Sequence, residues 1–169
     1  MTGRWAPPSG GDVSLLPAGR QWDMVCAPAA VGPWVTAHGR AGAMIRGDAG
    51  CAWLVPPGAT AGCRRPFAEL AQYVTVAATG HALIPHAGRA CGPGPHWVHP
   101  PRGPRAWMST ACLLADDLLI ATELLYGPLP LPEPCPVCAA AVYARTAEWA
   151  PDPAAPAGMW RAVHPACAP

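Results

Sequence analysis

The sequence predicts an α+β fold: a mainly antiparallel sheet with a covering helix, plus a small C-terminal zinc-knuckle tail. Short apolar runs separated by glycine and proline recur before residue 101, in the pattern of strands and turns. One apolar stretch of helical length, residues 109–125, comes after them. Two pairs of metal-ligand residue types, each three positions apart, follow residue 134. An order of strands followed by a long helix is typical of an α+β domain.

The composition is that of a globular chain with a core of useful size. Of its 169 residues, 51% are apolar and 12% are charged, which excludes a disordered protein. This length suggests one domain with a small appendage. The net charge is +1, and the eleven basic residues are all arginine but form no long run. The charge pattern alone therefore does not indicate a polyanion binder.

The sequence predicts a soluble cytoplasmic protein without a membrane partner. The N-terminus lacks an apolar core of signal-peptide length. The longest apolar stretch is interrupted by Asp116 and Asp117 and is too short to span a bilayer. In the cytoplasm the eight cysteines are expected to be free thiols or metal ligands rather than disulfides. Cys26, Cys51 and Cys112 lie in apolar segments and are predicted to be small core residues.

The first half of the chain predicts a loose arm followed by strands. Residues 1–19 are rich in proline and glycine, so we expect a flexible arm before the main domain, residues 20–127. Residues 21–28 are a short apolar run ended by proline, which is typical of a buried strand. A weak helix is expected next, ending at Gly39. Residues 41–58 give the clearest local signal, because two apolar runs flank a glycine-rich turn, as in a hairpin.

The second half of this domain predicts more strands and then the covering helix. Residues 73–88 contain two strand-like runs broken by a glycine, and a short strand is expected at residues 96–99. The helix is expected over residues 109–125, with Ser109 or Thr110 as its N-cap. A Gly-Pro pair directly after the helix is a typical stop signal.

Residues 128–169 are expected to form a stiff proline-rich linker and a tail with a metal site. Cys135 and Cys138 make a C-x2-C knuckle, whose tight turn brings two thiolates to one ion. His164 and Cys167 repeat the spacing after 25 intervening residues, more than the roughly 15–20 usual for paired knuckles. Four protein ligands leave no position for water, so the pattern predicts a structural Zn²⁺ and not a catalytic one. Alternatively, the four residues are unrelated, or the knuckle cysteines have a redox role.

Four segments of the main domain resemble a known family. The segments are "WDMVCAP" (residues 22–28), "CAWLVPPGAT" (51–60), "HALIPHAG" (81–88) and "GPGPHWVHPP" (92–101). In this order they resemble short actinobacterial proteins of the bifunctional DNA primase/polymerase N-terminal (prim-pol) family. The resemblance covers about half of the chain and includes no catalytic motif. It implies an α+β fold similar to RNA-recognition domains and, in active members, metal-dependent nucleotidyl transfer.

The carboxylates favour a catalytically degenerate member of that family. Nucleotidyl transfer needs carboxylates that hold two divalent ions close together. On a strand this requires Asp-x-Asp or Asp-x-Glu, because alternate residues share a face, and the sequence contains neither. Asp23 stands alone in its expected strand and Asp48 lies in an expected turn. An active nucleotidyltransferase remains an alternative, in which the fold brings Asp23 to Asp48 or Asp116.

Arginine and tryptophan residues suggest a partner for this domain. Aromatic side chains beside arginine can stack bases and contact phosphates. We therefore predict binding of nucleic acid, or of a replication-related partner. The nucleic-acid contacts are assigned to Arg64, Arg65, Arg89, Trp97, Arg102 and Arg105. The alternative is a protein–protein interaction module with a structural zinc, in which a surface rich in proline and tryptophan meets a protein partner.

Overall fold

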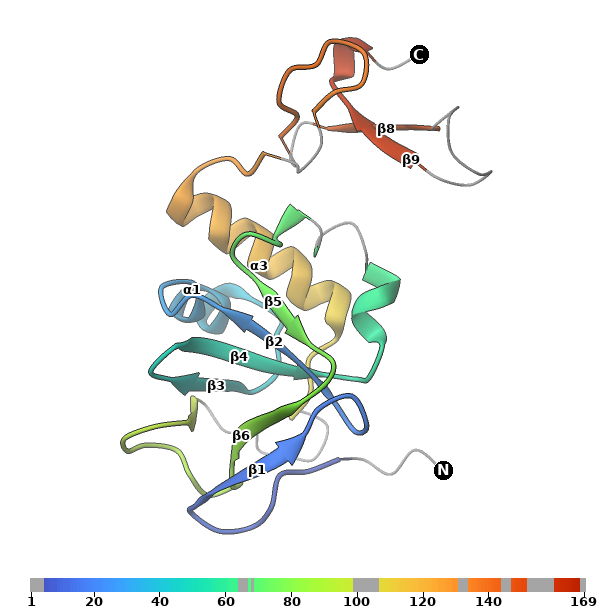
Figure 1. Ribbon diagram of the computed structural model, residues 1–169. Coiled ribbons are helices and arrows are strands. Elements are labelled where there is room, and N and C mark those ends of the chain that lie inside the picture. Colours follow the sequence, from blue (N-terminus) through green and yellow to red (C-terminus); the bar gives the residue numbers. More distant parts are fainter. Residues whose placement is uncertain are drawn as a thin grey trace. The chain divides into compact units, whose positions relative to one another are not determined.

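The computed structural model describes residues 5–63, 67, 69–98, 107–130, 134–143, 147–151 and 160–167. The chain forms two compact units, residues 1–125 and 126–169, and each is described by itself. The division falls two residues before the expected start of the tail at residue 128. Helices occur together with antiparallel strand pairs, which confirms the α+β fold class (Figure 1).

The first unit is built around a five-stranded antiparallel sheet. Its central strand, β4 (Gly50–Val55), is buried at every residue. β4 pairs with β2 (Asp23–Ala27) on one side and with β3 (Met44–Gly47) on the other. The order of the strands is β5 (Thr75–Ala77), β2, β4, β3 and β7 (His96–Val98). The strands expected at residues 21–28 and 96–99 are therefore confirmed as β2 and β7.

The hairpin expected within residues 41–58 is confirmed as the β3–β4 pair. Asp48 and Ala49 form its turn. Gly50 has φ +145°, and a Cβ at this position would collide with the carbonyl oxygen of Ala27. Glycine is therefore required where the hairpin passes the end of β2.

The short helix α1 (Val31–His38) covers one face of this sheet and is followed by Gly39, as expected (Figure 1). It lies close to β4, because a Cβ on Gly32 would sit 3.2 Å from the sulfur of Cys51. Pro33 lies in the first turn of the helix, where its missing N–H would have no helical partner in any case. Packing on β4 rather than intrinsic propensity thus accounts for this helix.

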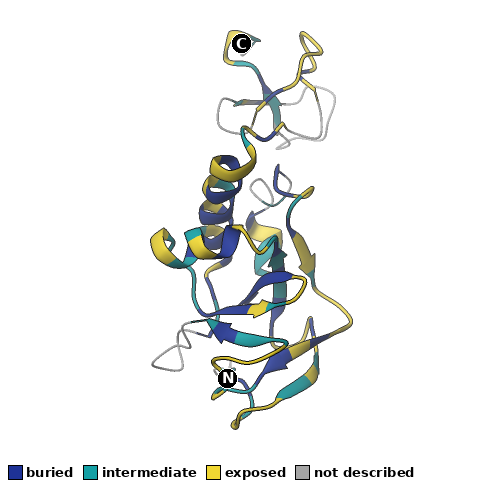
Figure 2. Cartoon of the chain, turned by 90° about the vertical axis from the view of Figure 1, so that its left-hand side faces the viewer, coloured by how far each residue is buried: buried dark blue, intermediate teal, exposed yellow. Residues whose placement is uncertain are grey.

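The helix α3 (Ala111–Tyr126) confirms the long helix expected at residues 109–125. Leu114 and Leu118 are fully buried, whereas Asp116 and Leu124 are exposed. Figure 2 shows this division between a buried and an exposed side of the helix. In the part of the chain that the structure describes, no helix is long and apolar enough to cross a membrane.

The start of α3 differs from the expectation for Ser109. The Ser109 hydroxyl accepts a hydrogen bond from the Gly42 N–H at 2.9 Å, and the Ser109 N–H donates to the Leu54 carbonyl at 2.7 Å. The side chain of Ser109 thus holds the loop before β3, while its backbone N–H holds the start of the helix to β4. The Thr110 carbonyl accepts from the Leu114 N–H at 3.0 Å, which makes Thr110 the N-cap position.

Asp117 joins α3 to the segment that follows α1. Its carboxylate is 5% exposed and accepts the Arg40 backbone N–H at 2.6 Å and the Arg40 guanidinium at 3.3 Å. Asp116 lies 3.8 Å from the same guanidinium, but both of these side chains are more than half exposed. Exposed ion pairs contribute little to stability. The hydrogen bonds of the buried Asp117 carboxylate are therefore the contacts that hold α3 to the segment after α1.

A two-stranded ribbon covers the opposite face of the sheet, and it corrects the expected flexible arm. Its strands are β1 (Val13–Pro17) and β6 (His81–Pro85), which pair antiparallel. Residues 13–17 are therefore strand and not loose chain. β1 could not be predicted from the sequence, because proline and glycine surround it and its partner strand lies far along the chain. One hydrophobic cluster joins the ribbon to the sheet, and its members include Leu16, Ala82, Ile84, Ile45, Leu54, Trp22, Trp97 and Trp107.

A disulfide corrects the expectation that all cysteines are free thiols or metal ligands. Cys63 and Cys112 are bonded, with their Cα atoms 5.3 Å apart. Cys63 ends the 3₁₀ turn η1 (Ala59–Cys63), and Cys112 lies in the first turn of α3. Cys112 is exposed and is therefore not the core residue that was expected. Cys51 is buried and Cys26 is half-buried, in line with the expectation for those two.

The second unit contains a hairpin that the sequence did not predict. Its strands are β8 (Glu148–Pro151) and β9 (Trp160–Val163), and the turn η2 (Pro165–Cys167) follows. One hydrophobic cluster described in this unit consists of four small buried residues, packed against three partly buried ones. The buried residues are Cys135, Val142, Ala150 and Val163, and the partly buried ones are Ala147, Ala162 and Cys167.

Replacing Asp117 with alanine should destabilise the first unit by about 2 kcal/mol, because it leaves the Arg40 N–H without its charged acceptor. Asp116→Ala removes an exposed carboxylate from the same guanidinium and should change stability by less than about 0.5 kcal/mol. Chemical denaturation of the two variants, followed by near-UV circular dichroism, measures the difference. Equal losses would mean that the buried contact is not the important one.

Candidate metal centre

Four side chains converge in the second unit, and they are the four residues that the spacing predicted. Cys135 and Cys138 come from the loop before β8, His164 directly follows β9, and Cys167 lies in η2. One ligand atom from each residue lies within 4.8 Å of the others. Ligands of a tetrahedral zinc-sized ion lie about 3.5–3.8 Å apart, given metal–sulfur bonds of about 2.3 Å. The cluster can therefore hold a metal ion after a contraction of about 1 Å.

The knuckle that carries the first two ligands is a tight, hydrogen-bonded turn. The Ala139 N–H donates to the Cys135 carbonyl at 2.8 Å, and the Cys135 N–H donates to the Ala140 carbonyl at 2.9 Å. Ala139 adopts φ +57°, the left-handed conformation that a residue with a Cβ rarely takes. These contacts close the chain between Cys135 and Cys138, so both thiols face the same point.

The second pair of ligands is placed by the end of the β8–β9 hairpin. The Cys167 N–H donates to the His164 carbonyl at 2.8 Å, which closes a turn between the two ligands. The His164 Nε2 lies 2.8 Å from the Ala141 carbonyl oxygen, which can only accept a hydrogen bond. Nε2 therefore carries the proton, and Nδ1, which lies 3.1 Å from the Cys138 sulfur, is the ligand atom.

The thiols of the cluster differ in their affinity for protons. The His164 backbone N–H, as the largest effect, lowers the pKa of Cys135 to about 6, with help from the N–H groups of Cys138 and Val137. Burial, followed by hydrogen bonds with the other two thiols, raises the pKa of Cys167 to about 11. The hydrogen bond with Cys138 raises the pKa of His164. The protein alone therefore does not hold three thiolates together at neutral pH, whereas a divalent cation would.

Trp97 does not have the role that the sequence suggested. Its side chain is fully buried, and its Nε1–H donates to the Pro85 carbonyl at 3.0 Å. Its ring meets the ring of Trp107 edge to face, with centroids 4.8 Å apart. No face of Trp97 is open for a base to stack on, because the ring is part of the core between the ribbon and the sheet.

Arg89 is likewise used inside the fold. Its guanidinium donates to three backbone carbonyls: Nε to Pro95 at 2.9 Å, Nη1 to Gly11 at 3.1 Å and Nη2 to Pro93 at 2.6 Å. These contacts hold the loop before β7 against the N-terminal segment. The remaining members of the predicted nucleic-acid set lie outside the described residues, and they are Arg64, Arg65, Arg102 and Arg105.

The register of the sheet separates the carboxylates that an active nucleotidyltransferase would have to combine. Asp23 pairs with Val55 at one end of β4, and Asp48 lies in the turn before its other end. Five residue steps of strand lie between, about 17 Å. Asp23 is buried and accepts a hydrogen bond from the Gly58 N–H at 2.8 Å. Asp116, on α3, is exposed and lies 3.8 Å from the guanidinium of Arg40. Among the described residues, the Cys/His cluster is the one group of three or more possible ligands.

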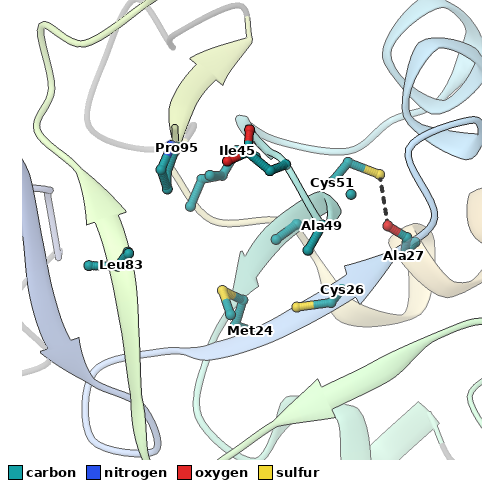
Figure 3. Close-up of a pocket in the computed structure, with 12 residues that line it drawn as sticks. Met24, Cys26, Ala27, Ile45, Ala49, Cys51, Leu83 and Pro95 are labelled. Atoms are coloured by element: carbon teal, nitrogen blue, oxygen red, sulfur yellow. Dashed lines mark hydrogen bonds between the residues drawn. The ribbon is translucent and has the colours of Figure 1, made fainter. Parts of the chain in front are cut away.

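A pocket on the ribbon side of the sheet had no signal in the sequence. It measures about 330 Å³, and Figure 3 shows Met24 and Cys26 from β2, Ile45 from β3, Leu83 from β6 and Pro95 around it. Burial raises the pKa of the Cys26 thiol. These residues come from four separate segments, and apart from the Cys26 thiol their side chains are apolar. Only the folded topology brings them together.

The comparisons with known proteins return no relative. No family model, no curated protein and no solved structure matches this chain. A function for this chain is therefore proposed from its own sequence and geometry.

Ala139→Gly should leave metal affinity almost unchanged, because the relief of the left-handed backbone, about 1 kcal/mol, offsets the extra freedom of the unfolded chain. Ala140→Gly brings no such relief and should weaken metal binding about two- to fivefold, for a cost of about 0.5–1 kcal/mol. Cobalt titration, read from the thiolate charge-transfer absorption, compares the two variants. A larger loss in the Ala139 variant would contradict the proposed strain at the knuckle.

Proposed function

We propose that residues 126–169 form a structural zinc-binding unit. The observation that carries this proposal is the convergence of three cysteines and one histidine, whose ligand atoms lie within 4.8 Å of one another. Thiolates favour soft or borderline ions, and a tetrahedral set of three sulfurs and one nitrogen is typical of zinc. The set is complete with protein ligands, so zinc would have no open position at which to activate water.

The small core of the unit gives the reason for a metal. The buried residues of its described hydrophobic cluster are two valines, one alanine and Cys135, which is itself a ligand. Burial of such side chains contributes about 1–2 kcal/mol each, which is little against the entropy of ordering the chain. Units of this size usually need a metal or disulfides. Structural zinc contributes an apparent 10–16 kcal/mol in small domains at neutral pH, which is sufficient here.

Zinc binding by the full chain tests this proposal. We expect one zinc per chain, and a strong chelator should unfold the second unit while leaving the near-UV signal of the first unit. Cys138→Ser should lose the zinc. Cys91→Ser is the matched control, because Cys91 is also an exposed free cysteine but belongs to no ligand group in the described residues. Equal zinc content in both variants would overturn the assignment of Cys138 as a ligand.

For the first unit we propose the function that the resemblance of residues 20–101 implies. It would be a prim-pol-like domain that binds nucleic acid or a replication-related partner without nucleotidyl transfer. The proposal is supported by the four sequence segments and by an antiparallel sheet with helices on one face. Arg89 and Trp97 serve the fold, so the contact with phosphates falls to the arginines at positions 64, 65, 102 and 105.

Fluorescence anisotropy with labelled single-stranded DNA over a salt series tests this second proposal. If Arg102 and Arg105 contact phosphates, the double change to alanine should reduce the slope of log K against log salt by about 1.4. The matched control changes Arg20 and Arg46, two exposed arginines outside the predicted set, to alanine. No binding by the wild type at low salt would overturn the nucleic-acid proposal and direct attention to a protein partner.

A further inference from the structure

The four ligands of the metal centre differ sharply in their access to solvent. Cys135 is fully buried and belongs to the core of the second unit. His164 and Cys167 are half-buried, and Cys138 is exposed. A reagent in solution therefore meets one thiol of the centre before the others, and that thiol is Cys138.

The knuckle also supplies a second thiol next to Cys138. The hydrogen bond from the Ala139 N–H to the Cys135 carbonyl closes the turn that carries both cysteines. This turn belongs to one short segment of chain, so it does not need the ion to keep its two sulfurs near each other. Cys167 lies on a different element, η2, which is joined to the knuckle through the ligand cluster.

We propose that Cys138 is an oxidation site, at which a peroxide converts the centre to a Cys135–Cys138 disulfide and releases the ion. The proposal rests on the structural zinc site proposed above. Cys91, the other exposed free cysteine, belongs to no such ligand group in the described residues, so its oxidation would not release the ion.

The chemistry proceeds in two balanced steps. The Cys138 sulfur attacks one oxygen of hydrogen peroxide, the O–O bond breaks, and a sulfenic acid and hydroxide form. The Cys135 thiolate then attacks the Cys138 sulfur, the S–O bond breaks, and a second hydroxide leaves as the disulfide forms. Two thiolates lose two electrons in total, and protons from solvent convert the two hydroxides to water. His164 and Cys167 alone remain as ligands, too few to retain the ion.

Peroxide treatment of the zinc-loaded full chain tests this inference. Zinc release is followed with a chromogenic chelator, and dimedone traps the first sulfenic acid for peptide mass spectrometry. We expect the first adduct at Cys138, one zinc released for each Cys135–Cys138 disulfide, and recovery of zinc binding after treatment with a dithiol reductant. A first adduct at Cys135 or Cys167 would overturn the inference. Cys91 serves as an exposed reference thiol, so a centre that still holds its zinc when Cys91 is fully oxidised would also overturn it.

Two variants keep a complete ligand set and separate the roles of the exposed and half-buried thiols. Cys138→His and Cys167→His each give a Cys2His2 set, which also binds zinc. Cys138→His should lose the fast phase of zinc release, whereas Cys167→His should keep it. Equal rates in the two variants count against Cys138 as the oxidation site. A wild-type chain that holds no zinc before peroxide is added would instead show that the zinc site itself is wrong.

Discussion

The burial of β4 on both of its faces is the constraint on which the first unit depends. Every residue of this strand is buried, so the sheet needs one cover for each side. α1 and α3 supply one cover, and the β1–β6 ribbon supplies the other, as Figure 1 shows. Side-chain hydrogen bonds keep these covers in position. Ser109 and Asp117 hold α3 in place, and Arg89 holds the loop before β7.

The second unit depends on its ligand cluster rather than on a buried strand. Its described core is too small to supply much hydrophobic stabilisation, and one of its buried residues is the ligand Cys135. The hydrogen bond from His164 to the Ala141 carbonyl orients the imidazole before any ion arrives. A metal therefore finds the ligands arranged but the three thiols not all ionised, so that binding should release protons.

The parts of this protein that could be predicted from its sequence are those fixed by local chemistry. The β3–β4 hairpin follows from its glycine turn, α3 follows from its apolar length, and each pair of ligands follows from its spacing. The parts that could not be predicted depend on contacts between distant residues. β1 has its partner in β6, Cys63 has its partner in Cys112, and the burial of Trp97 needs Trp107. A tryptophan or arginine looks the same in sequence whether it lies in the core or meets a partner.

The pairing of β1 with β6 also means that β1 is synthesised well before the strand with which it pairs. Val13 pairs with Pro85, so β1 leaves the ribosome long before its partner exists. At about 5–20 residues per second, β1 waits roughly 4–14 seconds. During that time Leu15 and Leu16 are available for wrong pairing, but Pro17 ends the strand and cannot donate a ladder hydrogen bond. Pro17, one of the prolines that made residues 1–19 resemble a loose arm, thus also limits wrong pairing of β1 during synthesis.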